Sequence, residues 1–248
     1  MSKKYNIALQ KHNNRRGPRP EIARLIEQVH RFINGKFEWP IDPRDFIFRQ
    51  LKSILIPAVP PFGLDLKADY MTQFGRRPDL AKEEERLIAT LQQLLDSCLD
   101  RTEFRHAQAM LFELVVVDDK KNERAGGIIH CATVSINGKT FKHKNHKEVD
   151  IGIDKLDERE FLELAECTLT YKDFQGKKSE NIEFLGKLSG QLRENVLPTT
   201  RVRIELIAAN SMTSRLDQIS NFDLGDFLAA SVKVVGRSYF PGSDVDLC

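Results

Sequence analysis

The sequence lacks the features that would direct the chain into a membrane or out of the cell. No apolar run approaches the roughly 20 residues that a membrane-spanning helix needs. The first 20 residues contain no continuous apolar segment of the signal-peptide kind, so export is not expected. The four cysteines, Cys98, Cys131, Cys167 and Cys248, form no Cys-x-x-Cys pair and no disulfide-framework spacing. We therefore expect a cytoplasmic protein with reduced thiols and no membrane association.

Nucleotide-binding glycine motifs are also missing, both the P-loop and the dinucleotide fingerprint. No histidine lies close in sequence to Cys167, which favours a buried structural thiol over a nucleophile. What the chain does contain is an ordinary globular composition, with 41% hydrophobic and 30% charged residues among 248. This length allows one large domain or two small ones.

The first hundred residues show helical patterns behind a basic tail. Residues 1–20 carry six lysines and arginines and no acid, although the whole chain has a net charge of only +2. Such a tail either binds nucleic-acid phosphates or is a solvated terminus. Apolar spacing and capping residues predict helices at 20–35, 42–54 and 79–99, with a proline-rich linker at 57–63. We expect residues 1–100 to form a helical N-terminal region with this basic tail.

From Thr102 the pattern changes to helices that alternate with strands. The predicted order is helix, hairpin, strand, strand, helix, strand, helix, strand, with Asn137-Gly138 as a hairpin turn. Residues 171–178 are predicted to form a basic loop, and Ser179 to begin the following helix. Residues 101–248 are therefore predicted to form an α/β domain with a mixed central sheet flanked by helices.

Two acids stand inside the apolar strands predicted at 147–154 and 161–170. Val149, Ile151 and Ile153 alternate with polar residues in the first of these strands, which contains Asp150, and Glu166 lies in the second. If the strands pair, both carboxylates converge at one edge of the sheet, where they suit a hard cation such as Mg2+. The ordinary alternative is that both acids are solvated on an outer sheet face.

This order of elements, with one acid in the middle strand and another in the next, resembles the PD-(D/E)xK, or restriction-endonuclease-like, superfamily. The matching residues are Glu113 in LFELVVV, Asp150 in EVDIGI and Glu166 in LAECTLT. Gln191 in SGQLRE stands where such nucleases often carry a glutamine. The resemblance covers roughly residues 102–209 and leaves the helical region unexplained.

The resemblance implies that Asp150 and Glu166 hold one or two Mg2+ (or Mn2+) ions and that Glu113 completes the catalytic acidic cluster. It also implies a basic surround for a polyanion. The residues expected to bind this substrate are Lys144, Lys147, Lys177, Lys178 and Gln191. The implied function is a Mg2+-dependent nuclease acting on DNA in restriction or antiviral defence, with nucleic acid as the partner. A homodimer or a larger defence complex stays open.

The chain departs from the superfamily pattern at Thr168, where a lysine usually stands two residues after the second acid. Lys172 is the preferred substitute as the catalytic cation, and Lys187 in the following helix is the alternative. A third reading is that catalysis is lost, which leaves a nucleic-acid-binding or assembly protein on the same fold. A competing zinc site from His130, Cys131, His143 and His146 is disfavoured, because strand alternation puts His130 and Cys131 on opposite faces.

Overall fold

The computed structural model describes residues 7–12, 17–34, 65–74, 82–123, 127–154, 161–168, 171–196, 201–209, 233–237 and 245–246. The predicted helix at 42–54, the linker at 57–63 and the helix predicted before the last strand lie outside these residues. The chain divides into two compact units, one of residues 16–111 and one of residues 1–15 together with 112–248. The predicted division at residue 100 differs from this one, because the start of the chain belongs with the α/β unit.

The helical unit contains α1 (Pro20–Asn34), α3 (Leu66–Phe74), α4 (Lys82–Ser97) and the first half of α5 (Arg101–Glu123). The predicted apolar stripe of α1 is buried throughout, and α1 packs on α4. Helix α3 was not predicted. None of the helices in the described ranges combines the length and apolar composition that a membrane-spanning helix needs.

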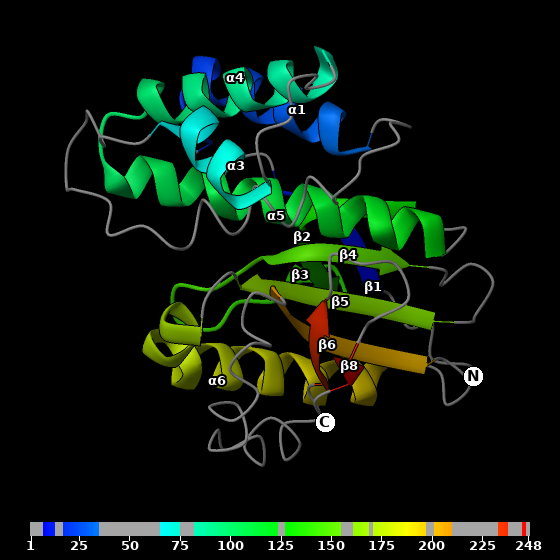
Figure 1. Cartoon of the computed structure of the whole chain (residues 1–248). Coiled ribbons are helices and arrows are strands. Elements are labelled where there is room, and N and C mark those ends of the chain that lie inside the picture. The colour runs from blue at the N-terminus through cyan, green and yellow to red at the C-terminus, as the bar shows by residue number, and fades with distance from the viewer. Residues whose placement is uncertain are drawn as a thin grey trace. The chain divides into compact units, whose positions relative to one another are not determined.

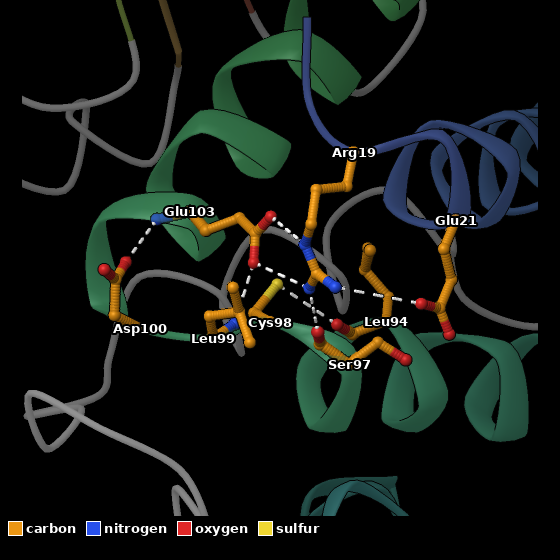
Figure 2. Close-up of polar contacts among 8 residues, drawn as sticks. All are labelled: Arg19, Glu21, Leu94, Ser97, Cys98, Leu99, Asp100 and Glu103. Carbon is orange, nitrogen blue, oxygen red and sulfur yellow. Dashed lines mark hydrogen bonds and ion pairs between the residues drawn. The ribbon is translucent and has the colours of Figure 1, made fainter.

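Arg19, the last basic residue of the predicted tail, ties the helical unit together (Figure 2). Its guanidinium donates to both carboxylate oxygens of Glu103, at 2.7 and 2.9 Å, and to the carbonyl of Ser97 at 2.5 Å. Glu103 also accepts the Leu99 N–H at 2.7 Å, and its own N–H donates to Asp100 at 2.8 Å. Asp100 therefore caps α5, and Arg19 joins that cap to the end of α4.

The described strands form one eight-stranded mixed sheet (Figure 1). They are β1 (Ile7–Lys11), β2 (Gly127–Ile136), β3 (Lys139–Thr140), β4 (Val149–Asp154), β5 (Phe161–Thr168), β6 (Arg201–Ala209), β7 (Lys233–Arg237) and β8 (Val245–Asp246). The order is β1-β2-β4-β5-β6-β7-β8, with β3 paired to β2. Strands β2, β4 and β5 are antiparallel neighbours, whereas β5, β6 and β7 run parallel. With helices against the sheet, this is an α/β fold of the predicted class.

Strand β1 contradicts one of the two alternatives for residues 1–20, that of a solvated terminus without structure. Ile7 pairs with Ile136 and Lys11 with Ala132, so these residues extend the sheet beyond β2. Leu9 is buried in the core, and Ile7 packs against that core. Apolar residues at positions 7 and 9 were the only local signal, and the backbone partner lies more than 120 residues away in sequence.

The hairpin prediction is confirmed. Asn137 and Gly138 both have positive φ, at 52° and 76°, and they connect β2 to β3. Two consecutive left-handed residues are what a tight hairpin turn of this type requires.

Helix α6 spans Tyr171–Asn195, so the predicted basic loop at 171–178 is wrong. The helix begins eight residues earlier than predicted, and Lys172, Lys177 and Lys178 lie in its first two turns rather than in a loop. Nothing in YKDFQGKK forbids a helix, because its one glycine, Gly176, costs only about 1 kcal/mol of helix stability.

The sheet is covered by α6 on one face and by the second half of α5 on the other (Figure 1). On the α6 face an apolar cluster joins the helix to the central strands. Its members include Leu162, Leu164, Phe184, Leu185, Leu188, Leu192, Ile204 and Leu206. The α5 face also carries buried polar side chains, and the candidate site lies there.

Candidate metal-binding site between helix α5 and the sheet

Asp150 and Glu166 lie on neighbouring strands, β4 and β5. A carboxylate oxygen of Asp150 accepts the backbone N–H of Cys167 at 2.8 Å, which fixes the Asp150 side chain beside the end of β5. Continuing the register of Ile151 with Ala165 places Asp150 across from Glu166, and both strands are interior in the sheet order rather than at a sheet edge as predicted. Both side chains are half-buried.

The pKa of the Cys167 thiol depends on burial and on the charges around it. Burial raises the pKa of its thiol well above the usual range, and the negative charges of Asp150, Glu113 and Glu166 raise that pKa further. Lys120 opposes this shift. The charges of all three predicted carboxylates thus act on one sulfur atom, but within the part of the chain that the structure describes their oxygens do not form a metal-ligand group. The thiol stays protonated at neutral pH, which supports a structural role for Cys167.

Glu113 comes from the middle of α5, where its side chain is buried. Its Oε2 lies 2.8 Å from Nε2 of His130 on β2. Burial alone would lower the pKa of His130, but its interactions with Cys131 and Glu113 outweigh this effect and raise the pKa to about 9. The Glu113–His130 pair therefore joins the helix to the sheet.

The backbone at Cys131 changes which face of β2 its neighbours occupy. Cys131 has a φ of 56°, in the left-handed region that residues other than glycine and asparagine rarely adopt. Ile129 and Ala132 consequently both pack toward α6, although strict alternation would separate them. The Cys131 carbonyl accepts the N–H of His12 at 2.7 Å, so the residue after β1 holds this bend in place.

This bend overturns the prediction that His130 and Cys131 point to opposite faces. Their ligand atoms and a carboxylate oxygen of Glu113 all lie within 4.8 Å of one another. The three residues form a group that could hold a metal ion. Glu113 and Cys131 are 3% and 7% exposed, whereas the His130 side chain is 22% exposed. The group is therefore largely buried, with the imidazole as its most exposed member.

The other two histidines of the predicted zinc site lie against α6 instead. Nε2 of His143 is 3.0 Å from Glu183, and Nε2 of His146 is 3.5 Å from Glu180. Since α5 and α6 cover opposite faces of the sheet (Figure 1), these two histidines are not part of the group of Glu113, His130 and Cys131.

Glu183 of α6 forms ion pairs with two lysines. Lys144 Nζ lies 2.5 Å from one of its oxygens, and Lys187 Nζ lies 3.2 Å from the other. The hydrogen bonds from Lys144 and Lys187, with a smaller contribution from His143, lower the pKa of Glu183 to about 2. Two lysines predicted to serve the substrate or the reaction are thus engaged with one surface acid.

The remaining predicted residues are spread over the α/β unit. Lys147 is half-buried in the connection before β4. Gln191 is exposed on α6 and donates to Glu194 of the same helix at 3.2 Å. Lys172, Lys177 and Lys178 lie in α6, and their side chains are outside the part of the chain that the structure describes.

A buried ionic group on the α5 face was missed in the sequence. Lys120 of α5 donates to Glu163 of β5 and, at 2.9 Å, to Glu205 of β6. Arg203 lies 3.5 Å from the other oxygen of Glu205. Glu163 in FLELAEC was a signal for this group, because an acid in an apolar strand needs a buried cation.

Comparison with known proteins adds no relative: no protein-family model matches the chain, and no curated protein is significantly similar to it.

Proposed function

We propose that the α/β unit is a Mg2+-dependent nuclease that hydrolyses phosphodiester bonds of DNA, in restriction or antiviral defence. The observation that carries the proposal is that Asp150 and Glu166 stand on two neighbouring central strands, with Asp150 fixed by the Cys167 N–H, and that the charge of Glu113 also acts on Cys167. Binding of one ion by all three carboxylates requires side-chain movement, because their oxygens do not already form a ligand group among the described residues. The order of elements also supports it. The middle strand β4 carries Asp150, the next strand β5 carries Glu166, and α6 then packs on the sheet.

The chemistry of the donor set fits Mg2+. All three residues offer carboxylate oxygens, which are the ligands that a hard divalent cation prefers. Asp150 is anchored by the Cys167 N–H and Glu113 is oriented by His130, so two of the three carboxylates are held by neighbours. Asp150, Glu166 and Glu113 would hold the ion. When bound, Mg2+ lowers the pKa of a water molecule and stabilises negative charge on a phosphate.

The residues of the chain have separate tasks in this proposal. Asp150 and Glu166 concentrate negative charge where the ion is needed. Lysines of the β3–β4 connection and of α6 would attract the phosphate backbone from the sheet face opposite to α5 (Figure 1). Lys144 forms an ion pair with Glu183. This acid therefore positions Lys144 and weakens the electrostatic attraction of the lysine for DNA.

Thr168 favours a second candidate function. It stands at the last position of β5, where the superfamily carries a catalytic lysine, and it cannot supply a positive charge. Lys187, one of the substitutes, is bound to Glu183. Lys172, in the first turn of α6, remains the proposed catalytic cation. Without such a cation the same unit would bind nucleic acid and not cut it.

Cleavage of supercoiled and linear DNA by the full chain, in Mg2+ or Mn2+ with a chelator control, tests the nuclease. Asp150→Asn and Glu166→Gln should each abolish cleavage, because the ion loses a charged ligand. Asp154→Asn is the matched control, since it lies on the same strand at the opposite end. Asp154→Asn should cut at the parental rate.

Metal-dependent cutting that survives both Asp150→Asn and Glu166→Gln would refute the proposed site. Salt-dependent DNA binding without cleavage in any divalent ion would favour the binding function. Lys172→Ala then tests whether Lys172 is the catalytic cation. If it is, turnover should fall tenfold or more while DNA binding is unchanged, because the charge acts on the transition state.

A further inference from the structure

We propose that Glu113, His130 and Cys131 form a second metal site, for a divalent transition-metal ion of the Zn2+ class. The fourth coordination position is left for water or an exogenous ligand. This site shares Glu113 with the proposed Mg2+ cluster but adds an imidazole and a thiol as donors, and it does not depend on nuclease activity.

The ligand types decide the metal. A thiolate and an imidazole are softer donors than carboxylates, so together they select Zn2+ over Mg2+. The carboxylate of Glu113 adds a third, charged donor. Sites with three protein ligands and an open position are the arrangement found in reactive zinc centres, whereas structural zinc has four protein ligands.

The distances require only a small adjustment. Zinc bonds of about 2.0–2.3 Å in a tetrahedron place donor atoms about 3.3–3.8 Å apart. The three donor atoms already lie within 4.8 Å of one another, and the Glu113–His130 pair at 2.8 Å would open slightly to admit the ion. Side-chain rotations suffice for changes of this size.

The left-handed backbone conformation at Cys131 is an independent observation in favour of a functional role for this group. Left-handed residues other than glycine typically cost of order 1 kcal/mol and concentrate at functional sites. Here the positive φ brings two consecutive side chains, His130 and Cys131, to the same face of β2 beneath Glu113. The hydrogen bond from His12 to the Cys131 carbonyl keeps this arrangement. An alternating strand would offer only one of these two ligands to α5.

Cobalt is the probe for this site, because a Co2+–thiolate bond gives a near-ultraviolet charge-transfer band and tetrahedral Co2+ absorbs in the visible range. The full-length protein is titrated with Co2+ and then with Zn2+, which should displace the cobalt and remove both absorptions. Cys131→Asn is the main variant, because asparagine tolerates the left-handed backbone and has no thiol. His130→Gln is the second, and it leaves Cys131 in place.

We expect the wild type to show the thiolate band. Cys131→Asn should remove it, and His130→Gln should weaken Co2+ binding by about 100-fold or more, since even partners behind the ligands contribute 10–100-fold. Cys167→Ala should leave the band unchanged, which excludes the other thiol that the structure describes in the α/β unit. Asp150→Asn should also leave it unchanged, although it abolishes cleavage under the proposed function, so failure of one proposal is distinguishable from failure of the other.

The site is overturned if the folded wild type gives no thiolate band, or if the band survives Cys131→Asn. Loss of the band in Asp150→Asn would also overturn it, because a single mixed cluster would then bind the metal. Far-ultraviolet circular dichroism checks the fold of each variant. Should Cys131→Asn not fold, full cobalt affinity in His130→Gln would still refute the proposal.

Discussion

Lys120 offers the sharpest test of how the α/β unit is held together. Its side chain is 4% exposed and lies between Glu163 and Glu205, which are 1% and 4% exposed. Replacing Lys120 with methionine keeps most of the volume and leaves two buried carboxylates without their shared cation. Breaking a buried ion pair in this way costs about 3–5 kcal/mol. The expected loss is a large share of the roughly 5–15 kcal/mol that stabilises a typical domain.

A rescue variant separates charge from packing. Removing all three charges, with Lys120→Met, Glu163→Leu and Glu205→Leu together, should return stability close to the wild type or above it, because no buried charge remains. Arg203 loses its contact with Glu205 in this variant, but its side chain is 46% exposed and water can solvate it. The coupling between the lysine and the two acids should therefore be several kcal/mol.

Urea unfolding followed by circular dichroism measures the free energies, and hydrogen exchange in peptides covering 161–168 and 201–209 assigns the loss to β5 and β6. A loss below 1 kcal/mol in Lys120→Met would refute the reasoning. So would a triple variant that is no more stable than the single one, since packing and not charge would then explain the loss.

Two further pairs of measurements test the fold. Gly152→Ala should destabilise the protein by about 1–3 kcal/mol, because an added Cβ would lie 2.8 Å from the Cβ of Ala132. Gly190→Ala, a helix position with open space around it, should instead stabilise by about 0.5–1 kcal/mol; equal effects at both positions would contradict the packing of β4. Arg19 lowers the pKa of Glu103, so this acid stabilises the folded state above its unfolded pKa, and the contribution is lost as pH falls through the lower folded pKa. The difference in melting temperature between wild type and Arg19→Gln should shrink from pH 7 to pH 3, and a constant difference would show that the ion pair is not its cause.

Local pattern was sufficient for elements whose partners are near in sequence. The apolar stripe of α1 matches its buried face residue for residue, because the helical period alone decides which side chains share a face. Asn137-Gly138 forms the predicted turn because few other dipeptides accept two positive φ angles. The alternation around Asp150 likewise identified β4 as a strand.

The same reasoning failed where a long-range partner decides the conformation. Ile7 and Leu9 are too few apolar residues to predict a strand, and β1 exists because β2 offers it an unpaired edge. His130 and Cys131 were placed on opposite faces by strict alternation, which holds only while every φ is extended. The left-handed angle at Cys131 depends on the packing of β2 and on a hydrogen bond from His12.

The sequence by itself determined the α/β class, the buried face of α1, the hairpin and the two acids inside apolar strands, because each follows from residues a few positions apart. Only the tertiary structure decided that Glu113 meets His130 and Cys131, and that Lys120 joins two strands through Glu163 and Glu205. These contacts link residues 17 to 85 positions apart. Residues so far apart in the chain meet only through the pairing of the strands and the packing of α5 on the sheet, and no local period encodes either.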